Sequence, residues 1–341
     1  MSARIAAFAA VCTAVALLGA SYVGLAALRS AGPSVSARAA RSPAIIGGTA
    51  QLGQELGRPH LVFLQPSGGD PTQNELAVAP LAGPSPRRTL SGLHCSRLYV
   101  DAGHGICVGQ NAAGVGHLLD AELRPVTTFL QPGLASRARI SPNGHWAAAT
   151  VFVSGHSYAV VGFSTQTLLY DTSTGAATNL ESFTVTRDGH AFQSPDFNFW
   201  GVTFANGARF YATLGTGGHT YLVEGDLARH TAEVLRDGVE CPSVSPDGTR
   251  IIYKARVPGT VGQWRLHVLD LRTMSDSALG ETRSVDDQAE WLDSRTVLYG
   301  LNDQGPPATL DVNLWALPVD GGPPTLYLQH AASPAVARGA P

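Results

Sequence analysis

The chain of 341 residues carries little charge, and almost none of it comes from lysine. Charged residues make up 14% of the sequence, against about one quarter in typical soluble domains. Lys254 is the single lysine, and the net charge at pH 7 is −3. A protein that binds nucleic acid through phosphate groups needs a basic face, which this composition does not supply. We therefore expect no nucleic-acid partner.

The sequence also lacks the short motifs of common catalytic and cofactor sites. The string nearest to a nucleophile elbow, Gly162-Phe163-Ser164-Thr165-Gln166, has no second glycine. Gly114-Val115-Gly116 is not followed by the third glycine of a dinucleotide-binding loop. No zinc-type spacing of Cys and His and no Asp-rich calcium loop occurs. These absences predict a protein that is not an enzyme and holds no metal or cofactor.

Glycine and proline, in contrast, are abundant, with 38 and 22 residues. They gather in turn signals between β-rich stretches: Ser141-Pro142-Asn143-Gly144, Asn206-Gly207 and Ser245-Pro246-Asp247-Gly248. In the third, Pro246 presets φ for a type I turn, and Gly248 supplies the positive φ that closes the hairpin. With a fainter turn at Asp293, these signals recur about every 40–60 residues, near the length of a propeller blade. The pattern predicts a β-propeller.

The strand pattern gives six blades over residues 45–335, so the fold class is an all-β, six-bladed β-propeller preceded by one N-terminal apolar helix. The first blade takes its strands from residues 61–65, 75–81 and 88–90, and its innermost strand cannot be placed. The second begins with strands at 97–100 and 106–108. The long interval between Asn143 and Asn206 carries an insertion, which we assign to an extra strand at residues 157–163. Ser194-Pro195-Asp196 is interpreted as a loop that enters the inner strand at 200–204.

One family resemblance follows from these repeats. Ser245-Pro246-Asp247-Gly248, followed by residues 249–254, resembles the repeat of the TolB-type six-bladed propellers. Residues 197–204 and 241–245 are similar to signal-peptide-bearing TolB-like proteins of actinobacteria. TolB is a periplasmic, protein-binding component of an envelope complex, so the resemblance implies a binding module. The separate N-terminal α/β domain of TolB has no counterpart in this sequence, and its partner is therefore not carried over.

The N-terminus reads as a membrane or export signal. The run from Ile5 to Leu28 has 24 residues and no charge, which is longer than a secretory apolar region of about 7–15 residues and long enough to span a bilayer. We expect residues 1–29 to be a signal peptide or a transmembrane anchor and residues 30–44 to be a flexible tether. Arg29, Arg38 and Arg41 outnumber Arg4, so the charge rule alone would leave the propeller in the cytoplasm. Export before a β-rich domain favours the opposite: a domain outside the cytoplasm, anchored or secreted after cleavage.

Two histidines hold equivalent places in the repeats. His156 and His219 each follow a glycine and precede a tyrosine by two residues, at the same distance from Asn143 and Asn206. Imidazoles on adjacent blades could contact one ligand, and we predict that these loops form the functional face. The alternative is that each His only bonds local backbone. No third ligand is marked by the sequence, so no metal is predicted.

The cysteines suggest one disulfide. Cys95 and Cys107 face each other if their hairpin turns about Asp101, and cannot meet if it turns nearer Gly103. The export signal favours the disulfide, with Cys241 as a buried free thiol.

Two functions from different classes remain. The first is a non-enzymatic, extracytoplasmic, monomeric propeller that binds an unknown protein or cell-envelope component. The alternative is a single-domain propeller enzyme or ligand sensor with a polar site at the channel mouth. The inner strands at 139–140, 202–204 and 243–244 are mostly apolar or small, which favours the first. Four or more charged side chains converging in the channel would favour the alternative.

Overall fold

A computed structural model describes residues 45–47, 49–67, 70–81, 87–109, 114–153, 164–302 and 312–338. The chain divides into two units, Met1–Ser42 and Pro43–Pro341, and all of the described residues belong to the second. The predicted signal or anchor (1–29) and tether (30–44) lie outside the described residues. Among the residues that are described, no helix has the length and hydropathy needed to cross a membrane.

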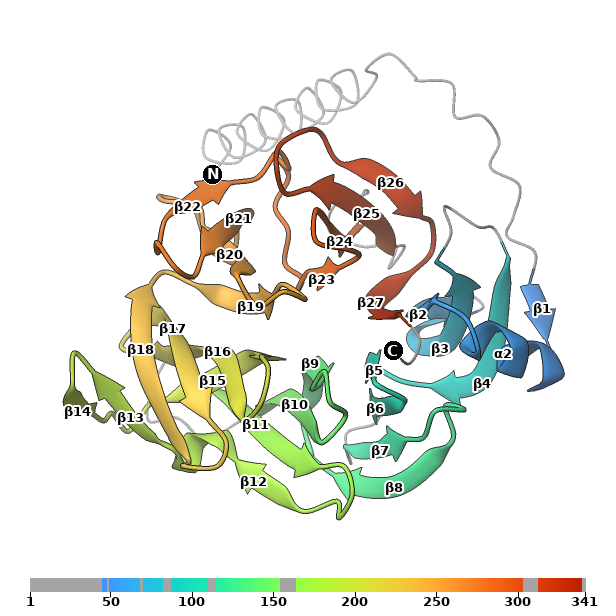
Figure 1. Cartoon of the computed structure of the whole chain (residues 1–341), viewed down its shortest axis with the longest axis horizontal. Coiled ribbons are helices and arrows are strands. Elements are labelled where there is room, and N and C mark those ends of the chain that lie inside the picture. The colour runs from blue at the N-terminus through green and yellow to red at the C-terminus, as the bar shows by residue number, and fades with distance from the viewer. Residues whose placement is uncertain are drawn as a thin grey trace, which may run out of the picture. The chain divides into compact units, whose positions relative to one another are not determined.

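The described residues form six β-sheets around a central channel (Figure 1), numbered here as blades 1 to 6 along the chain. From the channel outward, blade 1 contains β27 (Ala332–Ala337), β2 (His60–Ser67), β3 (Asp70–Pro80), β4 (Arg88–His94) and β1 (Ile45–Gly47). Blade 2 contains β5 (Arg97–Asp101), β6 (His104–Val108), β7 (Val115–Leu119) and β8 (Pro125–Leu130). Blade 3 contains β9 (Leu134–Ile140), β10 (Trp146–Val153), β11 (Ser164–Asp171) and β12 (Ala177–Asn179).

Blade 4 contains β15 (Asn198–Phe204), β16 (Arg209–Thr216), β17 (His219–Asp226), β18 (Thr231–Asp237), β13 (Thr184–Arg187) and β14 (His190–Phe192). Blade 5 contains β19 (Glu240–Val244), β20 (Arg250–Arg256), β21 (Trp264–Asp270) and β22 (Asp276–Ala278). Blade 6 contains β23 (Glu290–Trp291), β24 (Thr296–Asn302), β25 (Val312–Pro318) and β26 (Thr325–Leu328). A helix, α2 (Thr49–Leu56), precedes β2, and a 3₁₀ turn, η1 (Leu180–Ser182), follows β12. The all-β, six-bladed propeller predicted from the sequence is confirmed.

The repeated turn sequences build equivalent hairpins between the first and second strands. In blade 3, Ser141 Oγ donates to Asn143 Oδ1 at 2.7 Å and accepts from Trp146 N at 2.9 Å. In blade 5, Ser245 makes the same two bonds, to Asp247 and from Arg250 N. Gly144 and Gly248 follow with φ of 73° and 71°, which favours glycine. The turn chemistry is therefore local, which is why the sequence predicted it.

The ring is closed by the C-terminal strand. β27 supplies the innermost strand of blade 1, where it pairs with β2 in the register Leu61↔Val336 and Val62↔Ala335. Sequence reasoning could not place this strand, and β27 also extends to Ala337, past the predicted boundary at residue 335. The two ends of the described chain thus share one sheet.

The long interval between Asn143 and Asn206 contains two added strands. Residues 157–163 fall outside the described residues, whereas β13 and β14 are added after β12. β13 pairs in parallel with β18, at the outer edge of blade 4. The predicted loop at Ser194-Pro195-Asp196 does enter the inner strand β15.

The apolar core lies between neighbouring blades rather than in the channel. Leu169 of β11 packs in one cluster with Phe199 and Phe210 of blade 4. Similar clusters join the other blades, for example Leu98 of β5 with Val62 of β2. Successive side chains of a strand point to opposite sides. The side chains of an inner strand that do not enter these clusters therefore point away from them, and some of them point toward the channel.

Cys95 and Cys107 form a disulfide in blade 2, with Cα atoms 5.4 Å apart. The hairpin turns at Ala102 and Gly103, with Asp101 opposite His104. This is the turn for which we expected the two thiols to be out of reach. Cys95 precedes β5, and the next residue donates from Ser96 N to Val108 O of β6 at 2.8 Å, which holds this stretch of chain against the strand that carries Cys107. Cys241 is a buried free thiol, 2% exposed.

Candidate functional site: a polar channel floor beneath a cavity

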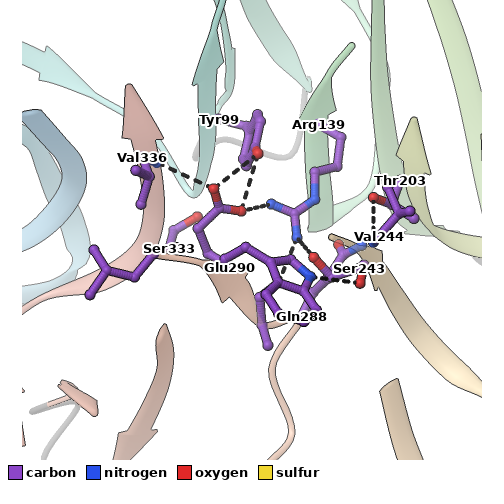
Figure 2. A network of polar contacts seen from close by, with 12 residues as sticks. Tyr99, Arg139, Thr203, Ser243, Val244, Gln288, Glu290, Ser333 and Val336 are labelled. Carbon is purple, nitrogen blue, oxygen red and sulfur yellow. Dashed lines mark hydrogen bonds and ion pairs between the residues drawn. The ribbon is translucent and has the colours of Figure 1, made fainter. Parts of the chain in front are cut away.

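A buried ion pair crosses the channel between opposite blades (Figure 2). Arg139 of β9 donates through Nη1 to Glu290 Oε2 of β23 at 2.6 Å. The two side chains are only 6% and 4% exposed. Burying one such charge without a partner costs several kcal/mol, so the two groups depend on each other.

Three further blades contact the same pair, as Figure 2 shows. The Tyr99 hydroxyl of blade 2 lies 3.1 Å from both Glu290 oxygens, and Val336 N of blade 1 donates to Oε1 at 3.3 Å. Arg139 Nη2 donates to Ser243 Oγ of blade 5 at 3.2 Å. The Arg139 guanidinium also lies 4.4 Å from the centre of the Tyr99 ring. Five blades therefore meet at one ion pair, which we call the channel clasp.

Gln288, which precedes β23, connects blade 4 to blade 5. Its side-chain amide donates to Val202 O of blade 4 at 3.1 Å and to Pro242 O of blade 5 at 2.7 Å. Both acceptors lie at irregular positions of their strands, next to Gly201 (φ 62°) and Cys241 (φ 48°). The left-handed backbone interrupts the ladder there and frees carbonyl oxygens for the amide.

The clasp stabilises its own charged form. Burial and then the Glu290 charge raise the pKa of Tyr99 well above its usual value, so the hydroxyl stays protonated and donates. Burial opposes the charge on Arg139, yet Tyr99 and Glu290 raise its pKa above the usual value. Both shifts favour a charged guanidinium and a neutral phenol in the clasp.

A cavity of about 660 Å³ lies over the clasp. All six blades contribute apolar wall residues: Ala337, Val100, Ile140, Phe204, Val244 and Trp291. Its polar lining includes Tyr99, Arg139 and Glu290, with Asp101, Arg338 and Asn206. Cavities of this size, mostly apolar with a few convergent polar groups, are typical ligand sites.

Asp101 is the titratable group that stands out in this lining. Its Oδ1 accepts from Ala102 N at 2.8 Å, at a turn residue with positive φ. Burial and then the nearby Glu290 charge raise the pKa of Asp101 to about 6. A carboxyl with a shifted pKa in a cavity is a recognised mark of a functional site.

The predicted histidine face lies away from this cavity. His219 is exposed at the start of β17, beside Tyr221. The cavity is lined by Asn206, at the other end of β16, and a strand of eight residues spans about 25 Å. His156 lies outside the described residues. The structure therefore does not bring His219 to the cavity.

The expectation of an apolar channel was wrong. Four charged side chains, Asp101, Arg139, Glu290 and Arg338, line one cavity. The sequence signal for one of them, Asp101, was an alternation, in which Tyr99 and Asp101 alternate with the core residues Leu98 and Val100 of β5. Within the described residues, no group of three His, Cys, Asp or Glu side chains is placed to hold a metal ion.

Comparison with known proteins places the fold. Solved structures that the chain resembles include TolB from Acinetobacter baumannii, with a TM-score of 0.58 and 16% identity, which covers 82% of this chain and 66% of that one. A TolB candidate from Agrobacterium tumefaciens has a TM-score of 0.50 and 13% identity, covering 81% and 90% of the two chains. The likeness is one of fold.

The fold is not confined to TolB-type proteins. A chain of a nidogen–laminin complex has a TM-score of 0.52 at 8% identity, covering 82% and 98% of the two chains. No protein-family model matches the sequence, and no curated protein matches it. The chain spans just under two thirds of the Acinetobacter protein. Function must therefore be argued from the site.

Proposed function

We propose that this chain is a non-enzymatic, extracytoplasmic propeller that binds a segment of a protein or another cell-envelope component in the cavity above the channel clasp. The observation that carries the proposal is the cavity itself, about 660 Å³ in volume, with walls from every blade. A rigid ring of strands presents this lining, as is usual for binding sites. The TolB-like fold of the neighbours supports a binding module.

The clasp supports binding rather than chemistry. Both oxygens of Glu290 accept hydrogen bonds, and the Arg139 amino groups are occupied by Glu290, Ser243 and the Ala289 carbonyl. A general acid or base needs a group that can reach the substrate. The clasp groups are used to join the blades.

A second candidate is a propeller enzyme or ligand sensor with its polar site at the channel mouth. The convergence of four charged side chains in one cavity favours this candidate, and Asp101 is its acid–base group. Both functions use the same cavity, so a test of occupancy comes first and a test of turnover second.

The test compares two exposed positions of blade 4, one in the turn before β16 and one at the start of β17. Asn206→Trp fills the cavity rim, and His219→Trp makes the same change at the other end of β16 and β17. The purified variants and the natural chain are used to capture cell-envelope components from membrane extracts. We expect Asn206→Trp to lose the captured component and His219→Trp to retain it.

The opposite result, loss with His219→Trp alone, would move the site to the predicted histidine face. Retention by both variants would overturn the cavity as the site. Melting temperatures close to that of the natural chain show that neither variant acts through unfolding. Chemical change in the captured component would favour the enzyme.

A further inference from the structure

Two arginines, Arg97 and Arg137, lie in the channel on the far side of the clasp from the cavity. Arg97 comes two residues before Tyr99 on β5, so both side chains point to the same side of the strand. Arg137 stands in the same relation to Arg139 on β9. Tyr99 and Arg139 line the cavity, whereas the two earlier arginines do not. We call the part of the channel that these two arginines occupy the lower channel.

One backbone oxygen brings the two guanidinium groups together. The carbonyl oxygen of Ser136 accepts from Arg97 Nε at 2.6 Å and from Arg137 Nη1 at 2.8 Å. Ser136 is an extra residue of β9, at the point where the pairing with β10 shifts register. A bulge of this kind leaves its residue unpaired in the ladder, so the carbonyl is free for side chains. Two positive charges from neighbouring blades therefore share a single acceptor.

Arg97 keeps donors that the protein does not use. Its Nη1 donates to Ser96 O at 3.0 Å, and Nη2 has no hydrogen-bond partner among the described residues. Nη2 also retains accessible surface, unlike Arg137 Nε, which is buried. In the described part of the chain, no carboxylate oxygen lies within 4.0 Å of Arg97. Burial and then the Arg137 charge lower the pKa of Arg97, so its charge is poorly compensated.

The lower channel carries more positive than negative charge. Arg137 Nη2 lies 3.5 Å from Asp286 Oδ1, and Lys254 bonds the same oxygen. The charge of Asp287 also reaches both arginines, but its Oδ2 accepts from a backbone amide of β24 at 2.8 Å. Three cations thus face two carboxylates, which leaves an excess of one positive charge. The Asp286 side chain is 61% exposed, so the site is open to solvent on that side.

We propose that the lower channel binds a carboxylate group, with Arg97 and Arg137 as its hydrogen-bond donors. A guanidinium presents paired N–H groups that match the two oxygens of a carboxylate. An excess of one positive charge suits a monoanion, whereas the two carboxylates of the protein repel a phosphate dianion more strongly. The clasp separates this site from the cavity, so the inference goes beyond the proposed function.

The first test compares acetate, acetamide and phosphate. Each is titrated into the full chain by calorimetry at pH 7.5, with sodium chloride keeping the ionic strength constant. We expect acetate to bind at least about tenfold more tightly than acetamide, its neutral counterpart, a difference of about 1.4 kcal/mol. Phosphate should bind more weakly than acetate. Equal binding of acetate and acetamide, or tighter binding of phosphate, would overturn the carboxylate site.

A fourth probe distinguishes the two sources of a carboxylate. N-acetyl-alanyl-alanine carries its carboxylate at the end of a peptide, whereas acetate is a small free acid. Tighter binding of the peptide than of acetate supports the site and assigns it to the C-terminus of a protein partner. Weaker binding of the peptide supports the site and assigns it to a small carboxylic acid.

Two substitutions should change acetate binding in opposite directions. Arg97→Gln removes the cation that has no ion-pair partner and should weaken acetate at least about tenfold. Asp286→Asn removes a competing carboxylate and should tighten acetate several-fold. Arg229→Gln and Asp188→Asn make the same changes in charge at exposed positions and should leave acetate binding within about twofold. A purely structural role of Arg97 does not predict the gain in Asp286→Asn, and weaker binding in that variant would contradict the site.

Two further variants test where the anion lies. Cys241→Ser should leave acetate binding unchanged, and a gain would overturn the site because the Cys241 thiolate would then balance the arginines. Asn206→Trp, which fills the cavity rim, should bind acetate as the natural chain does. Loss of acetate binding in Asn206→Trp would place the anion at Arg338 in the cavity and overturn the lower channel. Loss of captured component in that variant, with acetate binding intact, would support the two sites independently.

Discussion

Arg139 and Glu290 meet at 2.6 Å across the channel although 151 positions separate them in the sequence. They belong to blades 3 and 6, on opposite sides of the ring. Each blade otherwise packs mainly against its two neighbours, as the inter-blade clusters show. The ion pair therefore adds a direct link between blades that do not touch through their apolar faces.

Breaking this pair should be costly. Arg139→Met leaves the Glu290 carboxylate buried, and we expect a loss of about 3–5 kcal/mol in the free energy of unfolding. Urea unfolding at pH 7.5 measures it. Arg139→Met combined with Glu290→Gln should cost less than the sum of the single changes, because each single change leaves an unpaired charge and the double variant leaves none. Arg229→Ala, from an ion pair whose arginine is 81% exposed, is the control and should cost less than about 1 kcal/mol. Equal effects of the two arginine changes would contradict the role of the clasp.

Removing the disulfide should also destabilise the domain. Cys95 and Cys107 are 12 residues apart, and loops of this size give about 2–4 kcal/mol. We expect Cys95→Ala with Cys107→Ala to lose that amount in urea unfolding under oxidising conditions. Under reducing conditions the natural chain should match the variant. Peptide mapping should find Cys241 alkylated only after unfolding, and a Cys241 that reacts in the native protein would contradict its burial.

The sequence predicted the blades because their turns are locally encoded. Ser141 and Ser245 bond within five residues, so the same letters give the same hairpin wherever they occur. The closing strand has no such signal. β27 reads Ala-Ser-Pro-Ala-Val-Ala, and its partner β2 lies at the other end of the domain. Small residues suit an inner strand, but only the closed ring shows which strand they pair with.

The site was also harder to predict from the sequence, because its residues come together only when the ring closes. The alternation of Arg97, Tyr99 and Asp101 with Leu98 and Val100 indicates a strand with one polar side. Where that side points depends on the ring, because the outer side of a blade and the channel both tolerate polar residues. The meeting of Tyr99 with Glu290, 191 positions apart, is a property of the closed propeller.

Asp101 should lower stability above its pKa. The pKa is about 6 in the folded state and close to 3.8 in the unfolded chain, so the folded state binds the proton more tightly. Stability therefore falls as the pH rises from about 4 to about 6, and the cost persists above that range. Asp101→Asn should raise the free energy of unfolding by about 1–3 kcal/mol at pH 7.5 and leave it nearly unchanged at pH 4. Glu233→Gln, which makes the same change in net charge at an exposed position of β18, should show no such difference, and a loss of stability in Asp101→Asn at pH 7.5 would contradict the argument.

Export should depend on the apolar N-terminal run. A bacterial alkaline phosphatase joined to the C-terminus of the full chain should be active, because that enzyme requires export. The same fusion without residues 1–44 should be inactive. A green fluorescent fusion gives the complementary readout. A dead phosphatase with a bright cytoplasmic fluorescent fusion of the full chain would contradict an extracytoplasmic domain.

Removal of the closing strand should abolish folding rather than weaken it. A chain that ends at residue 330 lacks β27, whose Ala335 and Val336 are 0% and 1% exposed and pair with β2. The Val336 amide would also be lost from the clasp, and β2 would have an unpaired edge facing the channel. A strand edge of this kind is open to pairing with another chain. We expect this truncated chain to lose cooperative urea unfolding and to aggregate, whereas a chain that ends at residue 338 keeps both β27 and cooperative unfolding. Val336→Ala, which retains the strand but shortens one buried side chain, should lie between the two. Cooperative unfolding of the shorter chain at the natural midpoint would show that blade 1 does not need its C-terminal strand.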